Sequence, residues 1–156
     1  MRKSARGFTL IELLVVMSVI GILFAIGIAQ SMNFNRRQIL DQAAQELKNN
    51  LRLAQTKAAS GEKPSGCERL DGYKVKFNNS GSPNYYSLVA VCGGNEISNS
   101  EVRYDLPSAV TFSSLPSPVL FKVLAQGTNL NNNLTISLTA FGQSRTVTVT
   151  KEGKIE

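Results

Sequence analysis

Residues 6–30, RGFTLIELLVVMSVIGILFAIGIAQ, place a single carboxylate, Glu12, inside a long apolar run. From Phe8 to Ala29 the chain has 22 residues, and Glu12 is the only ionisable side chain among them. A helix rises about 1.5 Å per residue, so a helix of this length matches a hydrocarbon core of about 30 Å. The sequence therefore predicts a membrane-spanning helix over residues 8–30.

Basic residues flank this run on its N-terminal side. Arg2, Lys3 and Arg6 supply half of the formal net charge of +6. A short cationic start before an apolar run is typical of membrane-targeting segments, and the positive flank stays in the cytoplasm. Arg36 and Arg37 on the far side reduce the asymmetry. We expect a single-pass protein of the cytoplasmic (inner) membrane, with the rest of the chain outside the cytoplasm.

Two other membrane segments fit an apolar run of this kind. A secretory signal peptide has a shorter apolar region, of about 7–15 residues, and ends in small residues at a cleavage site. No such site follows here. A purely mechanical anchor would have no use for Glu12, because a carboxylate near the membrane core costs about 2–4 kcal/mol unless it is neutralised or paired.

The segment RGFTLIELLVVMSVIGIL resembles the leader and first helical turns of type IV pilins and type II secretion pseudopilins. The resemblance implies that residues 1–7 are a prepilin leader and that prepilin peptidase cleaves between Gly7 and Phe8. It also implies N-methylation of Phe8. The resemblance further implies that the carboxylate of Glu12 meets the cationic N-terminus of a neighbouring subunit in a filament. Such a pair would offset the desolvation of the carboxylate.

Residues 31–60 continue the helical pattern with an amphipathic face. Apolar residues recur at spacings of three and four, the helical period. This stripe comprises Leu40, Ala43, Ala44, Leu47, Leu51, Ala54 and Ala58. Gly61 and Pro64 then provide a stop signal. We expect one helix from Phe8 to about Ser60, whose second half packs on the protein's own sheet.

Residues 61–156 have the composition of a β-rich domain. Short runs of β-branched and aromatic residues are separated by Gly, Pro, Asn and Ser. The runs are GYKVKFN (72–78), YYSLVAVC (85–92), AVTFSS (109–114), LTISLTA (134–140) and RTVTVT (145–150). The predicted fold is therefore α+β and pilin-like, with a long N-terminal helix packed on one or two antiparallel sheets.

The ending FGQSRTVTVTKEGKIE is similar to that of minor pseudopilins of the GspH/FimT type. The shared pattern is a final hairpin with an internal Gly and a short terminal strand. Cys67 and Cys92 are the chain's two cysteines, and outside the cytoplasm we expect them to form a disulfide. Two separate buried thiols are the alternative. A metal site is not expected, because there is no His and no further Cys to complete a ligand set.

The residue inventory argues against an enzyme. Without His, no Ser-His-Asp or Cys-His arrangement can form, and no Gly-rich phosphate loop or paired-carboxylate motif stands out among the acids. We expect a structural or binding protein without a cofactor. Its expected partners are other pilin-like subunits, prepilin peptidase and the inner membrane before assembly.

Three functions remain open. The first is a minor subunit of a type II secretion pseudopilus or a type IV pilus. The second is a DNA-binding minor pilin for DNA uptake, which requires clustered cations; the candidates are Lys74, Lys76, Arg145, Lys151 and Lys154. Solvated strand edges, where Lys discourages edge pairing, explain the same cations without DNA. The third is a permanent single-pass receptor with a β-domain outside the cytoplasm.

Overall fold

The computed structural model describes residues 9–156, except for the side chains of residues 25–33. Its first element is the helix α1 (Leu10–Ser60). The chain divides into two units, Met1–Arg36 and Arg37–Glu156, and α1 contributes to both. Among the described residues, no helix combines the length and the hydropathy that crossing a membrane requires. The predicted membrane-spanning segment, residues 8–30, falls partly outside the described side chains.

The end of α1 confirms the predicted stop. Gly61 has a φ of 67°, the left-handed conformation that glycine adopts without strain. Its N–H donates to the carbonyl of Ala58, and the N–H of Glu62 donates to the carbonyl of Lys57. These two bonds form a Schellman motif, which satisfies carbonyls that the last helical turn leaves open. The helix therefore stops at Ser60.

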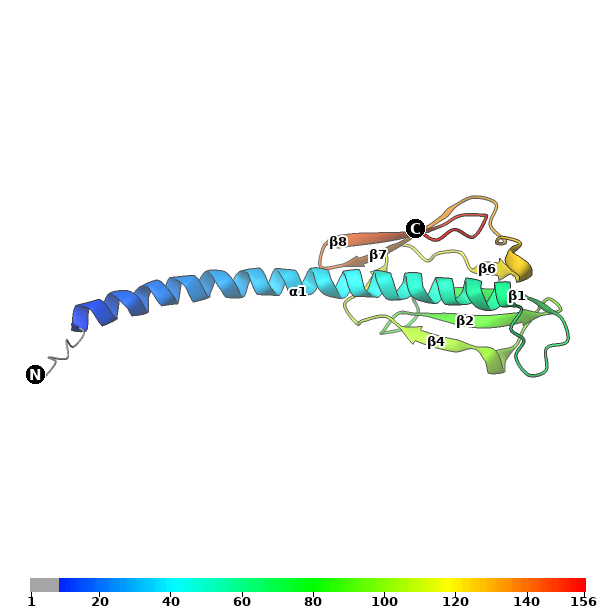
Figure 1. Ribbon diagram of the computed structural model, residues 1–156, viewed down its shortest axis with the longest axis horizontal. Helices are drawn as coiled ribbons and strands as arrows, with labels where there is room; N and C mark the ends of the chain where they lie inside the picture. The colour runs from blue at the N-terminus through cyan, green and yellow to red at the C-terminus, as the bar shows by residue number, and fades with distance from the viewer. Residues whose placement is uncertain (1–8) are drawn as a thin grey trace, which may run out of the picture. The chain divides into compact units, whose positions relative to one another are not determined.

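The second unit has two antiparallel sheets (Figure 1). The first sheet has the order β3-β2-β1-β6, with β4 also paired to β2; the second has the order β5-β7-β8. The strands of the first sheet are β1 (Leu70–Asn78), β2 (Tyr85–Cys92), β3 (Asn95–Glu96), β4 (Val102–Asp105) and β6 (Val119–Lys122). Those of the second are β5 (Thr111–Phe112), β7 (Leu134–Ala140) and β8 (Gln143–Val149). Two 3-10 turns, η1 (Ser98–Ser100) and η2 (Val123–Ala125), lie in the connections.

The apolar stripe of α1 forms the centre of the core, as predicted. Six of its seven members are at most 2% exposed, and Ala44 is half-buried. Side chains from both sheets join the same cluster, among them Val75, Phe121 and Ile136. In Figure 1, the part of α1 that belongs to this unit runs between β7 and β8 on one side and β2 and β4 on the other. The helix thus closes a core that neither sheet could enclose alone.

The predicted strands all occur, but the sequence pattern missed three others. β3, β4 and β6 are only two to four residues long, too short to show a clear alternation. The final hairpin is confirmed: β7 and β8 pair in full register, and a bridge joins Val149 to Ile155 beside it. Phe141 and Gly142 form its turn with φ values of 52° and 74°.

Candidate functional site

The first turn of α1 carries a capping arrangement at Thr9. Its hydroxyl oxygen accepts a hydrogen bond of 3.3 Å from the backbone N–H of Glu12, and its carbonyl accepts one of 3.2 Å from Leu13. A Thr followed three residues later by Glu is the capping-box pattern, which fixes where a helix begins. This role of Thr9 was not among the predictions above, although the T-x-x-E spacing signals it. Gly7 and Phe8 lie outside the described residues.

Glu12 occupies the third position of the helix, and its side chain is exposed. The ion pairs found among the described residues do not include it. A negative charge in the first turn interacts favourably with the helix dipole, so the position suits a carboxylate even before a partner binds. The described part of the chain therefore presents Glu12 outward, accessible to a positive group from another molecule.

The helix surface around Glu12 is apolar on every side. Each large apolar side chain between residues 10 and 24 is exposed, by between 42% and 84%. Ser18, within this segment, donates its hydroxyl to the carbonyl of Val15 at 2.8 Å, so its polar group is satisfied inside the helix. A helix that is apolar all round requires other helices or lipid to cover it. This segment is thus an interaction surface, and Glu12 is its one charged group.

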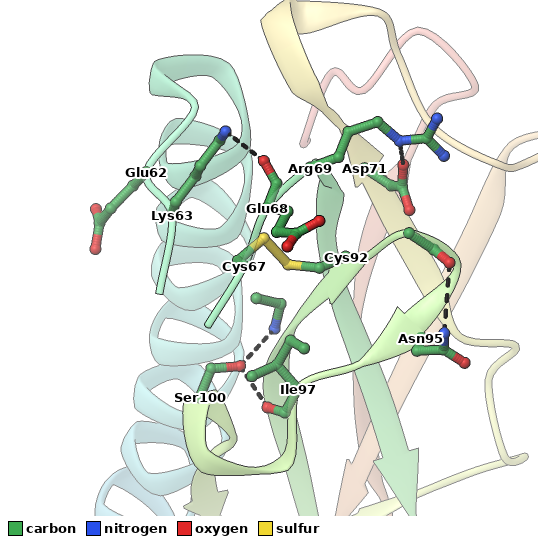
Figure 2. The surroundings of a disulfide bond; sticks show 12 residues. Glu62, Lys63, Cys67, Glu68, Arg69, Asp71, Cys92, Asn95, Ile97 and Ser100 are labelled. Carbon is green, nitrogen blue, oxygen red and sulfur yellow. Dashed lines mark hydrogen bonds and ion pairs between the residues drawn. A yellow bond between two sulfur atoms is a disulfide. The ribbon is translucent and has the colours of Figure 1, made fainter. Parts of the chain in front are cut away.

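The predicted disulfide is confirmed in the β-rich unit. Cys67, in the segment after α1, is bonded to Cys92 at the end of β2, with 5.7 Å between their Cα atoms (Figure 2). Nearby, the ammonium of Lys63 donates to the carbonyl of Glu68 at 2.8 Å, and Arg69 lies 3.5 Å from Asp71. The segment that connects helix and sheet is therefore held to the sheet covalently and by polar contacts.

Lys74 and Lys76 lie on the outer face of β1, as their spacing predicted, but both are paired. Lys74 is 2.9 Å and Lys76 2.8 Å from Glu96, and Lys76 also lies 3.1 Å from Glu101. Hydrogen bonds from Lys76 and then Lys74 lower the pKa of Glu96. A hydrogen bond from Ser87, followed by one from Lys76, lowers the pKa of Glu101. These side chains form a closed, nearly neutral network on the sheet.

The other three cations proposed for DNA are paired as well. Arg145 contacts Asp41 of α1 at 2.5 Å, which joins the final hairpin to the helix. Lys151 lies 3.7 Å from Glu152, and Lys154 lies 2.5 Å from Glu156. Counterion release on DNA needs cations that are available to phosphates. The arrangement of these five cations gives no support to a DNA-binding face.

Comparison with known proteins finds one family model, the prokaryotic N-terminal methylation motif, over residues 2–28. No curated protein and no solved structure matches the chain. The matched segment includes Thr9, Glu12 and the apolar helix surface described above. This match supports a type IV pilin-like protein, with the N-terminus that prepilin peptidase processes.

Proposed function

We propose that this chain is a minor pilin or pseudopilin of the GspH/FimT type. Prepilin peptidase cleaves it between Gly7 and Phe8, Phe8 is N-methylated, and the subunit joins a type II secretion pseudopilus or a type IV pilus. The observation that carries the proposal is the capped helix start, whose exposed surface is apolar on all sides and bears the single charge of Glu12.

In this proposal the apolar helix surface is covered first in the membrane and then in the filament. Before assembly, lipid covers the apolar helix and the β-rich unit lies outside the cytoplasm. In the filament, helices of neighbouring subunits replace the lipid, and Glu12 pairs with the cationic N-terminus of one of them. An unpaired carboxylate in an apolar environment is costly, so this pairing favours the assembled state and fixes the subunit's position along its neighbour.

The β-rich unit supplies binding surface rather than catalysis in this proposal. Its fold supports that role: the helix stripe, both sheets and the disulfide form one closed core. The GspH/FimT assignment is supported by the final hairpin with Gly142 at its turn and by the terminal bridge between Val149 and Ile155.

The first experiment is the intact mass and N-terminal fragmentation of the protein from native membranes. The expected chain begins with N-methylated Phe8. A Gly7→Val variant is expected to retain its leader, because a side chain at the cleavage position obstructs the extended backbone in the peptidase. The matched control is Ala5→Val, which introduces the same side chain into the leader but not next to the cleaved bond. This variant is expected to be processed. Native protein that retains residues 1–7 would instead support a permanent membrane receptor.

A further inference from the structure

The hairpin of β7 and β8 lies along α1 in a fixed direction. Arg145 of β8 is 2.5 Å from Asp41 of α1. Further along both elements, the side-chain amide of Gln55 donates to the carbonyl of Gly153 at 3.1 Å. β8 and α1 therefore run the same way. The turn of the hairpin lies at the end of the second unit where α1 enters it, as Figure 1 shows.

The tip of this hairpin extends as far as the first residue of the second unit. Gly142 precedes Arg145 by three residues, which is about 10 Å along a strand. Arg37, with which the second unit begins, precedes Asp41 by four residues, which is about 6 Å along a helix. The hairpin tip and Arg37 therefore lie at the same end of the unit.

An exposed phenylalanine occupies this tip, at a backbone position that does not favour it. Phe141 is 48% exposed and has a φ of 52°, and Gly142 beside it has a φ of 74°. Two positive φ values are typical of a type I′ turn, whose first position is usually Asn, Asp or Gly. A bulky side chain there is strained, and water around an aromatic ring is unfavourable. The turn geometry does not explain the phenylalanine, whereas an apolar environment outside the unit would.

We propose that the ring of Phe141 enters the membrane that α1 crosses, on the side away from the cytoplasm, before the subunit joins a filament. This inference rests on the proposed function, in which residues 8–30 span that membrane. Arg37 follows residue 30 by seven residues, about 10 Å along a helix, and one headgroup layer is about 5–8 Å thick. The short connection thus keeps this end of the unit close to the lipid headgroups.

The side chains at this end suit the surface of a bilayer. Aromatic side chains gather at the membrane–water interface, and apolar side chains of surface-bound segments are buried there. Arg37 is exposed, and the ion pairs found in the part of the chain that the structure describes do not include it. Its guanidinium can therefore bind the phosphate of a phospholipid headgroup. Together Phe141 and Arg37 orient the β-rich unit over the membrane until assembly removes it from the lipid.

Tryptophan fluorescence of the full-length protein in vesicles of zwitterionic and anionic phospholipid tests this contact. The chain has no Trp, so Phe141→Trp introduces a single reporter. Leu124→Trp is the matched control, because Leu124 is also exposed, at 71%, and also has a positive φ, of 54°. It lies in η2, at the other end of the unit. There the N–H of Thr128 donates to the carbonyl of Lys151, close to the contact of Gly153 with Gln55.

A quencher attached to the lipid near the headgroup is expected to lower the emission of Phe141→Trp at least about twofold, because the ring lies at that depth. The emission of Leu124→Trp should not change, and acrylamide in the water should quench it. Equal quenching of both reporters by lipid would overturn the assignment to the hairpin tip. Protection of Phe141→Trp from acrylamide without quenching by lipid would mean that protein covers the tip, and would overturn the inference as well.

Flotation of the same vesicles separates this inference from the proposed function. The full-length chain should float with the lipid, because residues 8–30 hold it there. A chain that does not float would contradict the proposed function itself. A chain that floats, and whose Phe141→Trp emission the lipid quencher leaves unchanged, would overturn only the contact of the tip with lipid.

A photoactivatable phospholipid provides a second measurement, which uses the unaltered chain. Mass spectrometry should find the label both in residues 8–30 and in the peptide that contains Phe141. Phe141→Asn introduces a residue that a type I′ turn favours, so its stability to denaturant should be equal or higher. Labelling at the tip should nevertheless fall severalfold, while labelling of residues 8–30 persists. Lower stability together with unchanged labelling at the tip would assign Phe141 to the fold instead and overturn the proposal.

Discussion

Asn50 of α1 donates a hydrogen bond of 2.7 Å from its side-chain amide to the phenol oxygen of Tyr86 in β2. Tyr86 is 2% exposed, and its burial raises the pKa of its phenol well above the usual range. The bond joins the helix to the first sheet and satisfies a hydroxyl that has little access to water. It is a polar contact at the margin of an otherwise apolar interface.

We expect Asn50→Ala to lower the free energy of unfolding by about 1–3 kcal/mol, because the Tyr86 hydroxyl would lose its partner while remaining buried. Tyr86→Phe should have a smaller effect, since Asn50 is only half-buried and its amide can bond to water instead. Thermal unfolding of both variants in detergent, followed by circular dichroism, would show this order. A larger loss for Tyr86→Phe would mean that the hydroxyl has another stabilising role.

Acid should weaken the ion network on the outer face of the first sheet. The pKa of Glu96 is lowered in the folded chain by hydrogen bonds from Lys76 and Lys74, and that of Glu101 is also lowered. Such groups stabilise the folded state above their unfolded pKa, near 4.5, and the stabilisation is lost as the pH falls through the lower folded value. Unfolding measured between neutral and acidic pH should show this decrease.

Glu96→Gln is the variant that isolates this contribution. It removes the shared carboxylate of Lys74 and Lys76, so its stability should decline less steeply in acid than that of the unaltered chain. The two curves should converge below the folded pKa of Glu96, where the native carboxyl is itself neutral. Curves that remain parallel across the acidic range would exclude the network as a source of pH dependence.

Loss of the disulfide should destabilise the β-rich unit. Cys67 and Cys92 are 25 residues apart, and closing a loop of that length stabilises a fold by about 3.5 kcal/mol in the chain-entropy model. The double variant Cys67→Ser/Cys92→Ser should therefore lose about that amount. The unaltered chain under reducing conditions is the control and should lose a similar amount. A double variant as stable as the oxidised chain would contradict this expectation.

Gly72 lies where strands β1 and β6 approach too closely for any side chain. A Cβ added there would lie 2.0 Å from the carbonyl oxygen of Phe121 in β6. The pairing of β1 with β2 also shifts its register next to Gly72. Gly72→Ala must displace backbone and should cost about 2 kcal/mol or more. Gly81→Ala, whose Cβ would lie 3.2 Å from the carbonyl of Pro83, should cost less. Denaturant titration of both variants would compare them.

Local periodicity was enough to predict the helix, its core stripe and its stop. Leu40, Leu47 and Leu51 recur at the helical period and are all buried, and Gly61 terminates α1 with the expected motif. These features depend on residues close together in the chain, so the sequence displays them directly. The pairing of Cys67 with Cys92 was predicted from the expected location outside the cytoplasm and from the presence of two cysteines in the sequence, not from geometry.

Features that depend on distant residues could not be predicted in this way. Lys74 and Lys76 alternate on one strand face, but the acids that neutralise them come from β3 and the segment after η1, which the sequence pattern did not reveal. The contact of Arg145 with Asp41 spans 104 positions. The charges along the chain therefore suggested that these cations were available to bind DNA. In the folded protein each of them is paired with a carboxylate.

Glu12 offers the sharpest test of the assembly proposal. Glu12→Gln keeps the shape of the side chain and removes its charge, so processing should continue while the amount of this subunit in sheared filaments falls at least about tenfold, consistent with the cost of breaking a desolvated pair. Ser18→Ala is the matched control on the same helix, because in the part of the chain that the structure describes that hydroxyl donates to the carbonyl of Val15, within the helix itself. Immunoblots of membrane and filament fractions would measure both steps. Normal amounts of the Glu12→Gln subunit in filaments would show that the apolar surface alone is sufficient and that the carboxylate is not paired there.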